Sequence, residues 1–171
     1  MGKSLLMKFF AMPVSFLKRI GFEIDEEMAG TYRDEMRFAP DYPFRFDVTW
    51  GTDSIWQWLQ PGDKFLVSEI SGTVTADNFC DNAACSGTLT LRYFGEHRLR
   101  YEFWFGTGGR IYRFVGEKVN IRWWNLPVSH TTCFGRITEN RTGQLVATAL
   151  VFFRLRTIPR FLRTFRLKIS K

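Results

Sequence analysis

The stretch Gly87–Phe105 constrains the fold most, because apolar and polar side chains alternate along both of its arms. Leucines alternate with polar residues in the first arm, and Tyr101, Phe103 and Phe105 do so in the second. A short turn at residues 95–97 separates the arms. Alternation with a period of two is typical of antiparallel strands that have one face on a core. The stretch therefore predicts a β-hairpin.

Further segments of this kind precede and follow the hairpin. Alternation predicts strands at 24–38, 44–50, 64–76, 131–139 and 144–156, with turn residues between them. Residues 110–115 and 117–123 predict two further strands or one bent strand. Thr52 or Asp53 is suited to cap a short helix over Ser54–Leu59. No strand alternates with a long helix, so a parallel sheet is not indicated. The sequence predicts a mainly β protein, a closed or nearly closed antiparallel barrel of roughly seven to nine strands.

Both ends of the chain depart from this pattern and predict amphipathic helices. In residues 1–22, a helix would place Leu5, Phe9 and Phe16 on one side and the basic residues on the other. Residues 158–168 change to the helical period, and Pro159 suits a first helical turn. The chain is therefore divided into a basic helical segment, 1–22, and a single barrel domain, 23–171, whose last element is this second helix.

Positive charge is concentrated at the same two ends. The net charge is +7, but Met1–Phe22 and Arg154–Lys171 together contain eleven basic residues and no acid, so the part between them is net acidic. Such asymmetry predicts contact with an anionic membrane surface. Solvated faces of two helices are the alternative, and nucleic acid ranks lower because the body is acidic. The candidate surface residues are Lys8, Phe9, Phe10, Phe16, Lys18, Arg19, Arg160, Arg163 and Arg166.

The three cysteines and two histidines restrict the chemistry. Cys80 and Cys85 lie in the segment CDNAAC, which predicts a loop. An odd cysteine count and the lack of a convincing secretion signal favour a reducing compartment. We therefore predict a cytoplasmic protein, peripheral to the inner face of the membrane. So few ligand residues predict no metal site, and no motif indicates a cofactor.

Short motifs along the chain resemble a known module. They are Glu27-Met28-Ala29-Gly30, Gly72-Thr73-Val74, Ser86-Gly87-Thr88-Leu89, Leu99-Arg100-Tyr101, Tyr112 to Lys118, Ser129-His130-Thr131-Thr132, Gly135-Arg136-Ile137 and Ile158 to Arg166. The chain resembles the lipocalin-like carboxyl-terminal module of some bacterial cholesterol-oxidase-like enzymes of the glucose–methanol–choline class. The resemblance implies a calycin-like barrel, a sterol-like or acyl ligand and an oxidoreductase partner. The flavin-binding part of those enzymes has no counterpart here.

Aromatic residues on the predicted strands are the best candidates for binding. A barrel of about eight strands is either filled by side chains or holds one small ligand, so these residues line a site for an apolar molecule or fill the core. The candidate ligand-binding residues are Tyr101, Phe103, Tyr112, Phe114, Trp123, His130 and Thr132. The charged residues Arg100, Glu102, Arg113, Glu117 and Lys118 either enter the lumen or form ion pairs outside it.

No residue set predicts catalysis. His130 and Cys133 are the densest pair of reactive side chains, but three positions apart on a strand they face opposite sides. We therefore predict a non-enzymatic barrel that binds an apolar ligand. An enzyme or accessory subunit acting on such a molecule, and a solid barrel used for protein interaction, are the alternatives.

Overall fold

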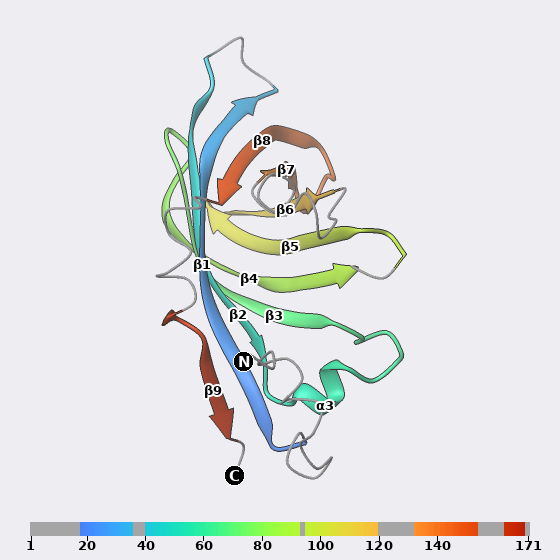
Figure 1. Cartoon of the computed structure of the whole chain (residues 1–171). Helices are drawn as coiled ribbons and strands as arrows, with labels where there is room; N and C mark the ends of the chain where they lie inside the picture. Colours follow the sequence, from blue (N-terminus) through green and yellow to red (C-terminus); the bar gives the residue numbers. More distant parts are fainter. Residues whose placement is uncertain (1–17, 36–39, 93–94, 120–131, 154–162, 170–171) are drawn as a thin grey trace.

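The computed structural model describes residues 18–35, 40–92, 95–119, 132–153 and 163–169. Its elements are β1 (Ile20–Asp34), β2 (Tyr42–Thr52), α3 (Ile55–Trp58), β3 (Val67–Ala76), β4 (Cys80–Arg92), β5 (Arg98–Thr107), β6 (Arg110–Lys118), β7 (Thr132–Glu139), β8 (Leu145–Phe153) and β9 (Arg166–Ile169). The strands pair in the order β2-β3-β4-β5-β6-β7-β8-β1-β9, and β1 also pairs with β2. This pairing closes an eight-stranded antiparallel barrel, as predicted, with β9 attached outside the ring (Figure 1).

The hairpin predicted from the alternating stretch is β4–β5. Its register pairs Leu89 with Tyr101 and Leu91 with Leu99. Gly95 has a φ of 98° in the connecting turn, a conformation that glycine adopts without steric cost. The alternation predicted which face of β5 is buried, since Tyr101 and the two phenylalanines that follow at every second position point into the barrel.

β1 is the longest strand and joins three others. It pairs with β2 over most of its length, with β8 from Met28 to Asp34 and with β9 from Ile20 to Glu23 (Figure 1). Between these last two ladders, the hydroxyl of Thr164 accepts a hydrogen bond from the Asp25 N–H at 3.0 Å and donates to the Asp25 carbonyl at 3.3 Å. A side chain thus replaces strand pairing at this point of β1.

The predicted short helix is present as α3, with a different capping residue. Ser54 itself is the N-cap, and its Oγ accepts a hydrogen bond from the Gln57 N–H at 3.3 Å. The segment containing Cys80 and Cys85 is part of β4, so the predicted loop is wrong. A tight turn, in which Asn78 has a φ of 62°, joins β3 to β4 and brings the cysteine segment into the ladder.

The predicted helices are not confirmed. Residues 158–162 lie outside the described residues, and the end of the second predicted helix is wrong because Arg166–Ile169 forms strand β9. Its residues alternate on a strand, so that Arg166 pairs with Glu23 and Leu167 with Phe22 in the ladder. At the other end of the chain, β1 begins at Ile20, inside the first predicted helix, and residues 1–17 lie outside the described residues.

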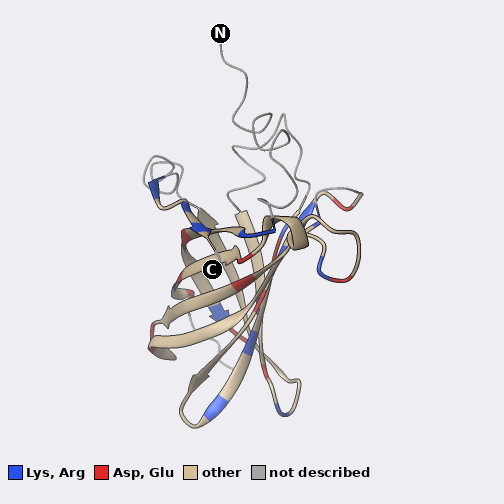
Figure 2. Ribbon diagram, turned by 90° about the horizontal axis from the view of Figure 1, so that it is seen from below, with Lys and Arg blue, Asp and Glu red and all other residues tan. Residues whose placement is uncertain are grey.

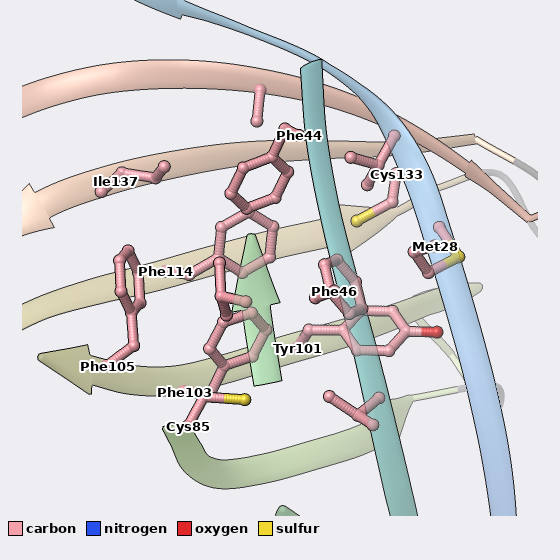
Figure 3. Packing of buried hydrophobic residues seen from close by; sticks show 14 of the residues in the cluster. Met28, Phe44, Phe46, Cys85, Tyr101, Phe103, Phe105, Phe114, Cys133 and Ile137 are labelled. Carbon is pink, nitrogen blue, oxygen red and sulfur yellow. The ribbon is translucent and has the colours of Figure 1, made fainter. Parts of the chain in front are cut away.

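Aromatic rings stacked on one another fill the centre of the barrel (Figure 3). Phe103 and Phe114 stack with ring centroids 4.7 Å apart, and Phe46 packs on both at 5.3 and 5.5 Å. The ring of Phe114 lies against the cross-strand pair Gly116–Gly135, in the space that two side chains would otherwise occupy. Small residues on β6 and β7 therefore give room to one large ring.

This packing makes Gly135 intolerant of a side chain. A Cβ there would lie 2.4 Å from a ring carbon of Phe114, so we expect Gly135→Ala to lower the free energy of unfolding by about 1–3 kcal/mol. Urea denaturation measures the change. The matched control is Arg136→Ala, on the exposed side of the same strand, for which we expect a change within about 0.5 kcal/mol. Equal stability of Gly135→Ala and the unsubstituted protein would contradict this account.

Candidate functional site

A buried carboxylate, Glu26 of β1, is the centre of the most unusual polar cluster in the barrel. Lys118 Nζ forms an ion pair with Glu26 Oε1 at 2.8 Å. The Tyr101 hydroxyl lies within hydrogen-bonding distance of both carboxylate oxygens, 2.9 Å from Oε1 and 3.0 Å from Oε2. Trp50 Nε1 donates to Oε2 at 3.1 Å. The side chains of Lys118 and Glu26 are only 3% and 5% exposed. We call Glu26, Lys118, Tyr101 and Trp50 the Glu26 network.

The barrel positions the network across its lumen. Tyr101 stands on β5, which is four strands from β1 around the eight-stranded ring, and its hydroxyl reaches toward β1 (Figure 3). Lys118 is the last residue of β6, opposite Leu99 in the ladder. Its ammonium lies 5.1 Å from the ring centroid of Tyr101 and 5.7 Å from that of Phe153. Both are distances at which a cation is attracted to the ring face.

Such a network is costly to build. Taking each ion out of water costs several kcal/mol, and the mutual attraction offsets this only when the geometry is good and further hydrogen bonds are made. Here both carboxylate oxygens have donors, from three different strands. Well-packed apolar residues of similar volume are often as stabilising, so net stability alone does not account for the network.

Ser68 adds a second polar group to the same level of the lumen. It pairs with Leu89, which in turn pairs with Tyr101, and all three are buried on the inner face. Ser68 is 1% exposed, and its Oγ has no hydrogen-bond partner among the described residues. A buried hydroxyl left in this state costs about 1–3 kcal/mol, so it is a natural contact for a polar atom brought from outside.

The Glu26 network and Ser68 together form a polar layer, which separates two apolar clusters. The larger contains Met28 and the stacked phenylalanines, and the smaller contains Ile20, Phe22 and Ile55 beside α3. Along the inner face of β1, the order is Phe22, Ile24, Glu26, Met28, so Glu26 lies between the clusters. Ile24 is buried but belongs to neither cluster. The end of the barrel nearer α3 is thus built differently from the aromatic centre.

The buried thiol beside this layer is not suited to nucleophilic chemistry. Burial raises the pKa of Cys133 to about 12, although the nearby charge of Lys118 acts in the opposite direction. At neutral pH the residue is therefore a thiol and not a thiolate, which is the reactive form. Cys133 packs inside the barrel as a small apolar residue.

The structure brings four of the predicted ligand-binding residues together. Tyr101, Phe103, Tyr112 and Phe114 all belong to the larger apolar cluster, where they contact one another or its other members. Trp123 and His130 lie outside the described residues. Thr132 is half-buried and precedes the inward Cys133, so it lies on the outer face of β7.

The charged residues whose side was left open are divided between the two faces. Arg113 and Arg100 contact Glu102, and Arg98 contacts Glu117 at 3.2 Å, all on the outer, partly exposed face. Lys118 alone of the five points inward. The other four, Arg100, Glu102, Arg113 and Glu117, thus form ion pairs on the outer face.

Three residues of the site were missed by the sequence analysis: Glu26, Trp50 and Ser68. Period-two alternation along β1 was a usable indication, because Glu26 has the same parity as the apolar Phe22 and Met28. Ser68 had no comparable indication, since serine is common on exposed strand faces.

The predicted anionic-surface residues have different environments. Lys18, Arg19, Arg163 and Arg166 are all exposed, and Arg166 also donates two hydrogen bonds of 2.8 Å to Asp25. These bonds lower the pKa of Asp25. Lys168 contacts Glu23 and Asp53. The other candidates, Lys8, Phe9, Phe10, Phe16 and Arg160, lie outside the described residues.

Within the described ranges, no three His, Cys, Asp or Glu residues are grouped closely enough to hold a metal ion. In the same part of the chain, no helix has the length and apolar character required to cross a bilayer. Comparison with known proteins found no matching family, no matching curated protein and no matching solved structure. The resemblance to the module of cholesterol-oxidase-like enzymes therefore stays a prediction.

We expect the losses of unfolding free energy from substitutions at Lys118 and Glu26 to be non-additive. Lys118→Met leaves a buried carboxylate without its cation, so we expect a loss of about 3–5 kcal/mol of unfolding free energy. Adding Glu26→Gln removes that charge and retains a carbonyl oxygen for Tyr101. The double variant should therefore be more stable than Lys118→Met alone, as measured by urea denaturation. Strictly additive losses would contradict the coupling.

Proposed function

We propose that this protein is a non-enzymatic binding module that holds one small, largely apolar molecule in the barrel, beside the Glu26 network. The observation that carries the proposal is the buried polar layer between two apolar clusters, with the hydroxyl of Ser68 unpartnered among the described residues. Small-molecule sites are mostly apolar and contain a few precisely placed polar groups. This layer has that composition.

The aromatic centre defines where such a molecule would lie. Phe103 and Phe114 stack, and Phe46 packs against both at a steep angle, so side chains fill that half. The half nearer α3 has apolar walls that include Ile24 and Leu66, both buried and neither part of a cluster. A ligand there would direct its polar group toward Ser68 and its body toward Phe22.

The competing proposal is an enzyme acting on such a molecule. Proton transfer would need Glu26 or Lys118 to exchange a proton with a substrate, yet each is held by the other at 2.8 Å. The high pKa of Cys133 also disfavours a thiolate nucleophile. These contacts favour binding over catalysis.

Tryptophan fluorescence tests the binding proposal, because Trp50 belongs to the network. Titration of the full-length, delipidated protein with a sterol, a retinoid and long-chain alcohols should give a saturable change in emission at a ratio of one to one. We expect Trp50→Phe to lose most of this change and Trp104→Phe, on the outer face of β5, to retain it. Native mass spectrometry reports any bound mass independently.

The absence of a saturable change and of any bound mass across this panel would contradict the binding proposal. It would favour the solid barrel used for protein interaction, for which the outer face offers Phe134 and Phe152, 59% and 42% exposed.

A second function, attachment to an anionic membrane, is favoured by how the chain ends meet. Ile20 pairs with Ile169, which places the exposed Lys18 and Arg19 beside β9. The apolar residues of β9, Leu167 and Ile169, are 55% and 74% exposed. Basic residues near an anionic leaflet each contribute about 1 kcal/mol, and inserted apolar side chains add to this. Lys and Arg occur at both ends of the barrel (Figure 2).

Vesicle co-sedimentation tests this attachment. At low salt, we expect the full-length protein to bind vesicles with anionic lipid more strongly than neutral vesicles. Lys18→Gln/Arg19→Gln should weaken that binding, whereas Arg136→Gln on the exposed face of β7 should change it little. Equal binding to both kinds of vesicle would overturn the proposal.

A further inference from the structure

We infer that the site beside the Glu26 network selects an uncharged polar group, a hydroxyl or a carbonyl, and rejects a carboxylate. This inference rests on the proposed function and names the chemical class of the ligand: long-chain alcohols, sterols or esters rather than fatty acids. It follows from the charge count of the polar layer and from the state of each group in it.

The layer is already neutral. The buried polar or charged residues of the described chain are Glu26, Ser54, Ser68 and Lys118, and Ser54 caps α3 outside the layer. The one ammonium is paired with the one carboxylate at 2.8 Å. The other described residues around the lumen at this level are uncharged: Trp50 on β2, Leu89 on β4, Tyr101 on β5, Cys133 on β7 and Phe153 on β8.

A ligand carboxylate would therefore give the layer a net negative charge. Among the described residues, its only buried cation would be Lys118, and that ammonium is shared with Glu26. Two carboxylates close to one cation in a low-dielectric interior repel each other and lose their hydration, which is the unfavourable case for a buried charge. An uncharged group avoids both costs.

The unpartnered hydroxyl supplies what an uncharged group needs. Ser68 can donate one hydrogen bond and accept others, so it can serve either a hydroxyl or a carbonyl oxygen. It is 1% exposed and stands at the level of Tyr101, through the pairings Ser68–Leu89 and Leu89–Tyr101. Glu26 stands on β1, only two strands from β3 around the ring, so its negative charge lies on the same side of the lumen as Ser68.

Three compounds with one chain length test the selectivity in the unsubstituted protein: hexadecanol, methyl hexadecanoate and hexadecanoate, titrated at neutral pH against Trp50 emission. We expect the alcohol and the ester to bind at least about tenfold more tightly than the acid, a ratio equivalent to about 1.4 kcal/mol. Ser68→Ala should lower the affinity for hexadecanol by about 3- to 10-fold, which is the effect of losing one neutral hydrogen bond.

Glu26→Gln provides the sharper test, because it makes the layer net positive. The variant should gain affinity for hexadecanoate relative to hexadecanol, whereas Glu102→Gln, on the outer face of β5, should leave the ratio unchanged. Circular dichroism checks that each variant is folded. The comparison of the three compounds uses the unsubstituted protein and does not depend on the variants.

The outcomes separate this inference from the function on which it rests. If none of the three compounds binds, the proposed function fails for this ligand class and the selectivity fails with it. If hexadecanoate binds as well as hexadecanol, the protein is a binding module and the inferred selectivity is wrong. If the ratio is the same in Glu26→Gln as in the unsubstituted protein, the ion pair does not set it, and the inference is also overturned.

Discussion

The hydrogen bond from Tyr101 to Glu26 crosses the lumen, and the arrangement of the other inner residues depends on it. It connects β5 to β1, strands that do not pair with each other, while Lys118 brings β6 to the same carboxylate. Because a buried carboxylate must have its donors at hydrogen-bonding distance, the network fixes the separation of these strands more strictly than apolar packing does. The aromatic rings then fill the space on one side of it.

The aromatic centre is possible because large and small residues alternate across neighbouring strands. Phe114 occupies the space above Gly116 and Gly135, and the short side chains of Ala147 and Ala149 lie on the next strand, β8. Interiors pack at the density of organic crystals, so the ring of Phe114 fits only because the residues against its face are small. The glycines of β6 and β7 are therefore part of the core, and their effect is steric.

The sequence was informative where the relevant interactions are local. Alternation within β4 and β5 depends on neighbouring residues, so the hairpin, its inner face and the closed barrel could all be predicted. The ion pair could not, because Lys118 and Glu26 are 92 positions apart and only the closed barrel brings them together. β9 was missed for a similar reason: its pattern of basic and apolar residues suits a helix as well as a strand, and pairing with β1 decides between them.

The same pairing changes what the basic carboxyl-terminal end can do. Counted along the sequence, Arg166 and Lys168 contribute to a positive end, but in the fold they contact Asp25, Glu23 and Asp53. The hydrogen bonds from Arg166 lower the pKa of Asp25, so their contribution to stability is present at neutral pH. It is lost as the pH falls through the lowered pKa, where Asp25 becomes protonated. These two basic residues thus act mainly to hold β9 on β1. At the chain ends, the basic residues that form no ion pair among the described residues are Lys18, Arg19 and Arg163, and any attraction to an anionic surface comes mainly from these.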